Sequence, residues 1–259
     1  MALIETRFFS KTLGMCATVN ALIPQPANPE SAKRAYPVVT LLHGYGQNAS
    51  AWIRMSMIEA LSRQYGVAVI MPDAFLSSYA DMAHGLKYQT YLSEELPDVM
   101  RGFFPLSDRR ADNFLLGCSM GGYGAFRIGL SHPESYSAIG SLSSGHRSIP
   151  TFIGRRDDRG FAITDAIFAS AGSDPSDDET ESRARALANA GTAPKIFVRV
   201  GKSDPYTLEN CRQARDFFSA LPVEFDYAEA EGGHSWTFWN AQLDAFFQFC
   251  GLTREEKYL

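Results

Sequence analysis

One serine of this chain lies in a pattern that can make its hydroxyl a nucleophile. Ser119 is the centre of Gly117-Cys118-Ser119-Met120-Gly121, with the apolar run 114–116 before it and a helix-compatible segment of small residues after it. A strand that turns directly into a helix brings backbone against backbone, and glycines on both sides of the serine leave room for that contact. The pattern is typical of a nucleophile elbow, which lifts the serine hydroxyl out of a sheet.

A serine hydroxyl reacts well only when a base removes its proton and an acid orients that base. In proteins with this elbow, the acid and the base follow the serine in the order Ser, Asp, His. Of the five histidines, His234 fits the order, because it follows a glycine pair on a loop after the last apolar run. Asp204 comes directly after another apolar run and precedes a helical segment. We therefore predict Ser119, Asp204 and His234 as a catalytic triad.

Alternative roles exist for some of these residues. Asp204 stands before Pro205, which also suits the cap of a helix. His234 could instead be a histidine of a surface loop without a catalytic role. We expect His43 to brace its own loop. Four other acidic residues compete with Asp204: Asp174, Asp177, Asp178 and Asp226.

Two backbone N–H groups are expected to stabilise the negative charge that develops on the substrate oxygen. One belongs to Met120, the residue after the nucleophile, where the positive end of the helix dipole adds to the effect. The other is expected from the loop 43–48, whose glycines let the backbone of Tyr45 bend toward Ser119. Gly46 is a competing donor for this second position.

Apolar runs that suit buried strands alternate along the chain with segments of helical periodicity. The runs 3–9 and 14–22 flank a short turn and predict an antiparallel hairpin. The alternation after them predicts an α/β fold of the α/β-hydrolase type, with a mostly parallel sheet and helices on both faces. Further strands are expected at 37–42, before Gly117, and at 67–71, 136–142, 195–200 and 223–228, with helices at 51–65, 88–104, 208–220, 236–250 and from the elbow to Leu130.

The length of 259 residues suits a single α/β domain that spans residues 1–259. Strand and helix signals are interrupted from about residue 146 to 192, where polar runs surround one amphipathic piece. We predict a small lid insertion there, because long segments inside compact domains are usually functional or disordered. A solvated connection with short helices is the alternative.

The composition argues against several classes of protein. The 24 basic and 29 acidic residues give a net charge of -5 without a basic cluster, so we expect no nucleic-acid partner. No apolar run approaches the roughly 20 residues of a transmembrane helix, and we expect no membrane association. Four widely spaced cysteines and an N-terminus without a signal-peptide pattern suit the cytoplasm. Motifs for metals, dinucleotides and phosphates are absent from the sequence, so we expect no metal and no cofactor.

Several motifs, spread over nearly the whole chain, resemble those of the esterase D-like serine esterases, and most closely those of the bacterial tributyrin esterases. They are HGYGQN at 43–48, GLKY at 85–88 with SEELP at 93–97, FFPLS at 103–107, GCSMGGYG at 117–124, and GHSW at 233–236 with FW at 238–239. The resemblance implies an α/β-hydrolase fold and hydrolysis of short-chain acyl esters, with Ser119, Asp204 and His234 as the triad.

We therefore expect a serine carboxylesterase that acts on a small-molecule ester and forms an acyl-enzyme on Ser119. Relatives with the same triad include feruloyl and acetyl-sugar esterases, S-formylglutathione hydrolases and acyltransferases, and fold and triad alone do not separate them. A non-catalytic binding protein is the alternative from another class, and the intact triad argues against it. A homo-oligomer is compatible with the sequence.

Overall fold

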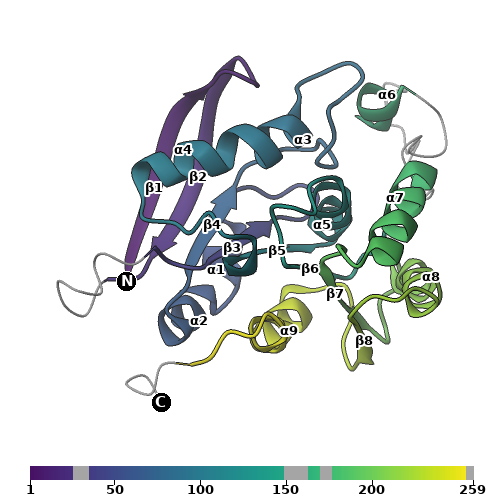
Figure 1. Cartoon of the computed structure of the whole chain (residues 1–259). Coiled ribbons are helices and arrows are strands. Elements are labelled where there is room, and N and C mark those ends of the chain that lie inside the picture. Colours follow the sequence, from purple (N-terminus) through teal and green to yellow (C-terminus); the bar gives the residue numbers. More distant parts are fainter. Residues whose placement is uncertain (26–34, 149–162, 170–176, 255–259) are drawn as a thin grey trace.

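The computed structural model describes residues 1–25, 35–148, 163–169 and 177–254, and one eight-stranded sheet forms its centre (Figure 1). The strand order is β1-β2-β4-β3-β5-β6-β7-β8. Strand β2 is antiparallel to both of its neighbours, and the remaining pairs are parallel. The strands are β1 (Ala2–Ser10), β2 (Met15–Ile23), β3 (Val38–Leu42), β4 (Ala68–Pro72), β5 (Asn113–Cys118), β6 (Ala138–Leu142), β7 (Lys195–Gly201) and β8 (Phe225–Ala230). This arrangement confirms the predicted fold class.

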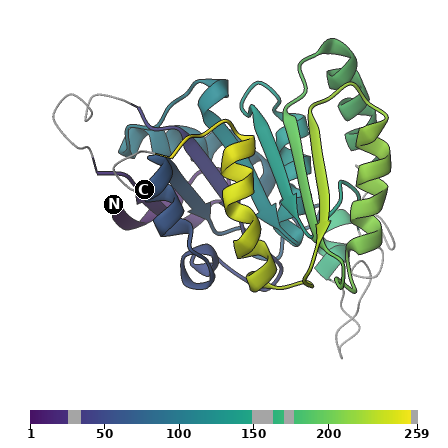
Figure 2. The same cartoon turned by 90° about the horizontal axis from the view of Figure 1, so that it is seen from below.

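Helices cover both faces of the sheet. Three of them, α1 (Ala51–Met55), α2 (Ile58–Tyr65) and α9 (Trp236–Phe249), pack on one face. Figure 2, seen from below, shows α9 and α2 on the near side of the sheet. The opposite face is covered by α3 (Tyr88–Thr90), α4 (Leu96–Phe103), α5 (Met120–Ser131), α7 (Asp177–Ala190) and α8 (Leu208–Ser219). None of the helices in the described ranges is long and apolar enough to cross a membrane.

The central strands β3 and β4 are almost entirely apolar because both of their faces are buried. In β3, Val38 and Leu42 belong to the core under α4 and α5, whereas Val39 and Leu41 belong to the core under α2 and α9. Successive side chains of a strand point to opposite faces, so a strand between two layers of helices needs apolar residues at both parities. The short apolar runs of the sequence therefore become central strands.

The predicted single helix at 51–65 is wrong. The chain forms two helices there, α1 and α2, because Ser56 has an extended backbone with φ -140° and ψ 173°. The Ser56 hydroxyl donates to Trp52 O at 2.5 Å and accepts a hydrogen bond from Ile58 N at 3.3 Å. These local bonds replace part of the helical ladder, which is a common effect of serine inside a helical segment.

The region of the predicted insertion contains two described helices, α6 (Ile163–Phe168) and α7. Residues 149–162 and 170–176 of the predicted lid lie outside the described residues. Helix α6 contacts the loop after β4, where Ala83 N and His84 N donate to Ile167 O and Ala166 O at 2.9 and 2.8 Å. Helix α6 of the predicted insertion is therefore attached to the loop after β4.

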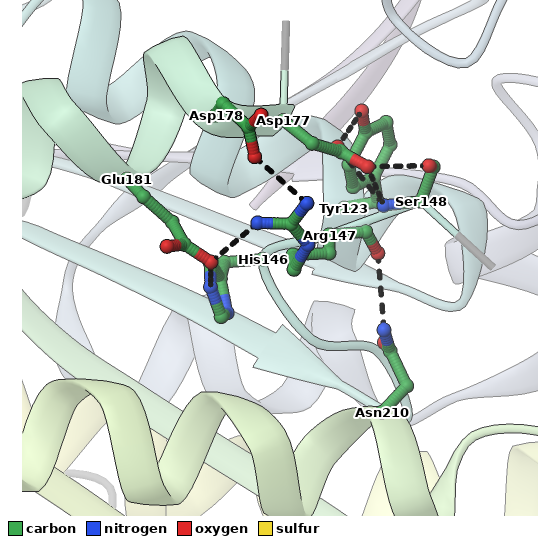
Figure 3. Close-up of polar contacts among 8 residues, drawn as sticks. All are labelled: Tyr123, His146, Arg147, Ser148, Asp177, Asp178, Glu181 and Asn210. Atoms are coloured by element: carbon green, nitrogen blue, oxygen red, sulfur yellow. Dashed lines mark hydrogen bonds and ion pairs between the residues drawn. The ribbon is translucent and has the colours of Figure 1, made fainter. Parts of the chain in front are cut away.

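The start of α7 is anchored by a buried carboxylate, which Figure 3 shows together with its neighbours. Asp177 accepts hydrogen bonds from Tyr123 Oη at 3.0 Å, from Ser148 N at 3.0 Å and from Ser148 Oγ at 2.5 Å. Tyr123 belongs to α5, so this carboxylate joins the residues on both sides of the segment 149–176 to the helix that follows Ser119. One turn further along α7, Glu181 binds Arg147 Nη1 at 2.6 Å.

We predict that Asp177→Asn lowers the free energy of unfolding by about 1–3 kcal/mol, because the amide leaves buried donors without the acceptor that they face. The neighbouring Asp178→Asn is a matched control. Its side chain is 89% exposed and binds Arg147, so its loss is expected to cost under about 1 kcal/mol. Urea unfolding of both variants makes the comparison, and equal losses would show that Asp177 is not an anchor.

Candidate active site

Ser119 lies at the sharp turn between β5 and α5, with φ 53° and ψ -120°. The turn is possible because two glycines allow close backbone contacts. A Cβ atom on Gly117 would lie 2.0 Å from Gly121 O, and one on Gly121 would lie 2.3 Å from Leu42 O. Ser119 N donates to Leu142 O at 2.8 Å, which ties the turn to β6. A positive φ at a serine is strained, and such strain is concentrated at functional sites.

The structure brings the three predicted triad residues together. His234 Nε2 lies 2.9 Å from Ser119 Oγ, and His234 Nδ1 lies 2.8 Å from Asp204 Oδ2. The three side chains come from loops that follow β5, β7 and β8 at the carboxyl edge of the sheet. This arrangement lets the imidazole accept the serine proton on Nε2 while the carboxylate holds its other nitrogen.

The Asp204 carboxylate is buried and has a hydrogen-bond donor for each oxygen. Oδ1 accepts from Tyr206 N and Thr207 N at 3.0 Å each, and Oδ2 accepts from Thr207 Oγ1 at 2.8 Å as well as from His234. Burial alone would raise the pKa of Asp204, but the hydrogen bonds from His234, Thr207 and Tyr206 outweigh it and lower the pKa to about 2. The carboxylate therefore stays ionised at neutral pH.

The alternative role of Asp204 as a helix cap accounts for the contacts of one of its two carboxylate oxygens. Its Oδ1 holds the turn that leads into α8, while its Oδ2 faces His234. One carboxylate thus shapes the loop and contacts the imidazole.

The competing acids bind other partners. Asp177 and Asp178 belong to the anchor of α7, and Asp226 Oδ2 binds Arg199 Nη2 at 2.7 Å. Asp174 lies outside the described residues. Of the described acids, Asp204 is the one in contact with His234.

The loop after β3 forms a tight turn next to the elbow. Gln47 N donates to Gly44 O at 3.3 Å, and Gly46 has φ 71°, which fits the glycine position of a type II turn. A Cβ atom on Gly44 would lie 3.5 Å from Cys118 O, so the turn abuts the residue before the nucleophile.

Three backbone N–H groups near the elbow, those of Tyr45, Gly46 and Met120, have no acceptor among the described residues. Such groups can hold a developing oxyanion. The assignment of Tyr45 and Met120 to the oxyanion hole, with Gly46 as competitor, stays a prediction.

His43 braces the turn. Gly44 O can only accept, so the proton lies on His43 Nδ1, which donates to Gly44 O at 2.8 Å. His43 Nε2 then accepts from Ala74 N at 3.0 Å in the loop after β4. The proposed bracing role of His43 is therefore confirmed.

Sequence reasoning missed two further residues that support this turn. Gln47 Oε1 accepts from Gly44 N at 3.0 Å, and Tyr79 Oη donates to His43 O at 2.7 Å. Gln47 lies in the same motif as His43, but Tyr79 comes from a distant polar and aromatic segment that carries no signal for this contact.

Two aromatic side chains that were also missed flank the histidine. The ring centres of Tyr206 and Trp239 lie 5.5 and 5.1 Å from that of His234, with both rings nearly perpendicular to the imidazole. Trp239 Nε1 donates to Ser143 Oγ at 3.0 Å, which fixes the indole. These contacts restrict the rotation of His234 and leave its Nε2 directed at Ser119.

We predict that Gly121→Ala destabilises the protein by about 3 kcal/mol and lowers activity, because the methyl group would displace the backbone at the elbow. The matched control is Gly102→Ala, where nothing lies within 4 Å of the added Cβ atom. This exposed position in α4 is expected to gain about 0.5–1 kcal/mol. The melting temperature and the rate of ester hydrolysis should be measured for both variants. If the two variants had the same stability and activity, the close contact at Gly121 would not be needed for the elbow.

We predict that Asp204→Asn lowers kcat by about 10⁴, the loss seen when a triad carboxylate becomes an amide that favours the wrong imidazole tautomer. Stability should change far less, since the amide oxygen can still accept from Tyr206 N and Thr207 N. The control is Asp226→Asn, which removes a charge bound to Arg199 and should keep its kcat. Near wild-type kcat for Asp204→Asn would place the acid elsewhere.

Comparisons with known proteins show the family to which this chain belongs. The family model described as "Putative esterase" matches residues 10–249. An acetyl esterase of Caldicellulosiruptor saccharolyticus is 31% identical over 269 residues, covering 96% of this chain and 98% of its own.

Solved structures of two other proteins have the same fold as this chain. FphF, a fluorophosphonate-binding serine hydrolase of Staphylococcus aureus in a substrate-bound structure, superposes with a TM-score of 0.87 at 25% identity, over 96% of this chain and 98% of its own. The S-formylglutathione hydrolase of Staphylococcus aureus, at 24% identity and a TM-score of 0.78 over 96% and 98% of the two chains, shares the fold. The chain therefore belongs to this esterase family and is a carboxylic ester hydrolase with the α/β-hydrolase fold.

Proposed function

We propose that this esterase hydrolyses short-chain acyl esters through an acyl-enzyme on Ser119. The observation that carries the proposal is the continuous hydrogen-bonded row from Ser119 Oγ through His234 to Asp204, at 2.9 and 2.8 Å. A serine so placed can attack a carbonyl carbon without help from a metal or a cofactor. The ester itself is the expected small-molecule partner.

In the first half-reaction, Ser119 Oγ attacks the ester carbonyl carbon while His234 Nε2 takes the hydroxyl proton. The carbonyl oxygen becomes an oxyanion, for which the N–H groups of Met120 and of Tyr45 or Gly46 are the proposed donors. The bond to the leaving alcohol then breaks, and His234 returns the proton to the alcohol oxygen. Asp204 stabilises the imidazolium between these two proton transfers.

In the second half-reaction, water attacks the acyl carbon and gives one proton to His234. The tetrahedral intermediate collapses, the proton passes to Ser119 Oγ, and the carboxylic acid leaves. The same acyl-enzyme would acylate an alcohol if one replaced water, so the fate of the acyl group separates a hydrolase from an acyltransferase.

The preference for short acyl groups is supported by the name of the relative from Caldicellulosiruptor saccharolyticus, an acetyl esterase. Feruloyl esters, acetylated sugars and S-formylglutathione-type thioesters are the alternative substrates for the same triad. The cytoplasm is the compartment that we propose, since all four cysteines are free thiols.

We predict that Ser119→Ala lowers ester hydrolysis by several orders of magnitude with little change in the melting temperature, because catalysis by a triad collapses when its nucleophile is removed. A fluorophosphonate probe should add its mass to the peptide that contains Ser119 in the wild type and not in the variant. The mechanism fails if a folded Ser119→Ala protein stays active. A folded, unlabelled wild type without activity would instead support a binding protein.

We predict that kcat/KM for 4-nitrophenyl esters falls from acetyl and butyryl to long acyl chains. Feruloyl esters, acetylated sugars and S-formylglutathione belong in the same panel, and each reaction should be repeated with an added alcohol to detect acyl transfer. Faster cleavage of long chains would contradict the proposed preference, and a transferred acyl group would identify an acyltransferase.

A further inference from the structure

The first strand leaves one edge of the sheet open. Strand β1 is the outermost in the strand order, and it lies at the outer edge of the molecule in Figure 1. Its inner edge pairs with β2 without interruption, from Ala2 opposite Ile23 to Ser10 opposite Met15. No strand among the described residues pairs with its outer edge. The backbone donors and acceptors of every second residue of this nine-residue strand therefore face outward.

This edge lacks most of the devices with which proteins prevent strand pairing, although Glu5 and Arg7 place two charges at its centre. The strand ALIETRFFS contains no proline, no glycine and no lysine, and its regular register with β2 shows no bulge. Short edge strands, prolines, bulges and lysines are the common protections. A regular nine-residue strand without them is a template for another strand.

One face of β1 carries exposed side chains in a symmetric order. Leu3 and Phe9 are 50% and 63% exposed at the two ends. Glu5 and Arg7 lie between them, with side chains 52% and 72% exposed, and Arg7 Nη2 is 2.7 Å from Glu5 Oε1. Thr6 is the midpoint of the strand, so the apolar pair and the charged pair are each centred on it.

We propose that β1 is a homodimer interface in which two copies of the chain pair their β1 strands antiparallel around a twofold axis at Thr6. In this register Glu5 faces Arg7 of the second copy, and Leu3 faces Phe9 of the second copy. On the other face of the strand, Ile4 faces Phe8 of the second copy. From residue 3 to residue 9, the facing pairs are apolar, oppositely charged or the Thr6 pair on the axis, and such cross-strand pairs stabilise sheets.

Neighbouring symmetric registers are less favourable. Centring the axis on Glu5 or on Arg7 places like charges directly opposite each other, which destabilises strand pairing. The axis at Thr6 also overlaps all nine residues of the strand. The opposite charges of Glu5 and Arg7 and the full overlap of the two strands therefore both favour the register centred on Thr6.

The charges of β1 could instead keep partners away, since charged residues on an edge strand often do so. Repulsion between identical strands needs charges of one sign, however, and here Glu5 and Arg7 cancel when the strands run antiparallel. The other edge of the sheet behaves differently. Strand β8 carries the acids Asp226 and Glu229 and no basic residue, and both acids bind arginines of the same chain.

Sedimentation equilibrium of the full chain over a range of concentrations tests the proposal. The wild type is expected to dimerise reversibly. Glu5→Lys gives the strand two cations and Arg7→Glu gives it two anions, so each variant alone should show a dissociation constant higher by roughly tenfold or more. An equal mixture of the two variants should form heterodimers, and the double variant Glu5→Arg/Arg7→Glu should dimerise like the wild type.

Ester hydrolysis by each variant is the control for folding, because three strands separate β1 from β5 and the nucleophile. A wild type that stays monomeric at its highest soluble concentration would overturn the proposal. Dimers that both single variants retain would also overturn it, since the interface would then lie on another surface. Failure of the mixture and of the double variant to recover dimers would reject the register at Thr6.

Discussion

The active site depends on a close contact between backbones at the elbow. Gly121 packs against Leu42 O at the end of β3, and Gly117 packs against the first turn of α5. No side chain fits in either place, so the helix can begin directly behind Ser119 and leave the N–H group of Met120 without an acceptor among the described residues. The same contact brings the turn after β3 next to Cys118. Ser119 and the proposed oxyanion donors are thus positioned by the same close backbone contacts.

The carboxylate of Asp204 links loop structure to chemistry. Its two oxygens accept from Tyr206 N, Thr207 N, Thr207 Oγ1 and His234 Nδ1, and these bonds hold its pKa at about 2 although the group is buried. A buried charge without such donors would be costly. The hydrogen bonds from the loop after β7 therefore replace those that water would make to the Asp204 carboxylate. They also fix the position of the oxygen that accepts from His234 Nδ1.

Polar side chains around the site brace backbone rather than substrate. His43, Gln47 and Tyr79 hold three backbone groups of the turn after β3, while Trp239 and Tyr206 contact the ring of His234. Because a misplaced catalytic group costs much of the rate, this bracing supports the proposed catalytic role of Ser119 and His234. The hydrogen bond between Tyr123 and Asp177 connects the start of α7 to α5, since Tyr123 lies one turn beyond Ser119.

The sequence by itself determined the α/β architecture, the elbow and the identity of the residues proposed for the triad, because these features depend on local patterns. Apolar runs, glycines around Ser119 and the order Ser, Asp, His can all be read along the chain. Only the tertiary structure decided that Asp204 rather than Asp226 reaches His234, that Ser56 divides a helix, and that Tyr79 and Trp239 support the site. Those outcomes depend on contacts between segments far apart in the chain, which the packing of the sheet and helices creates and no local pattern encodes.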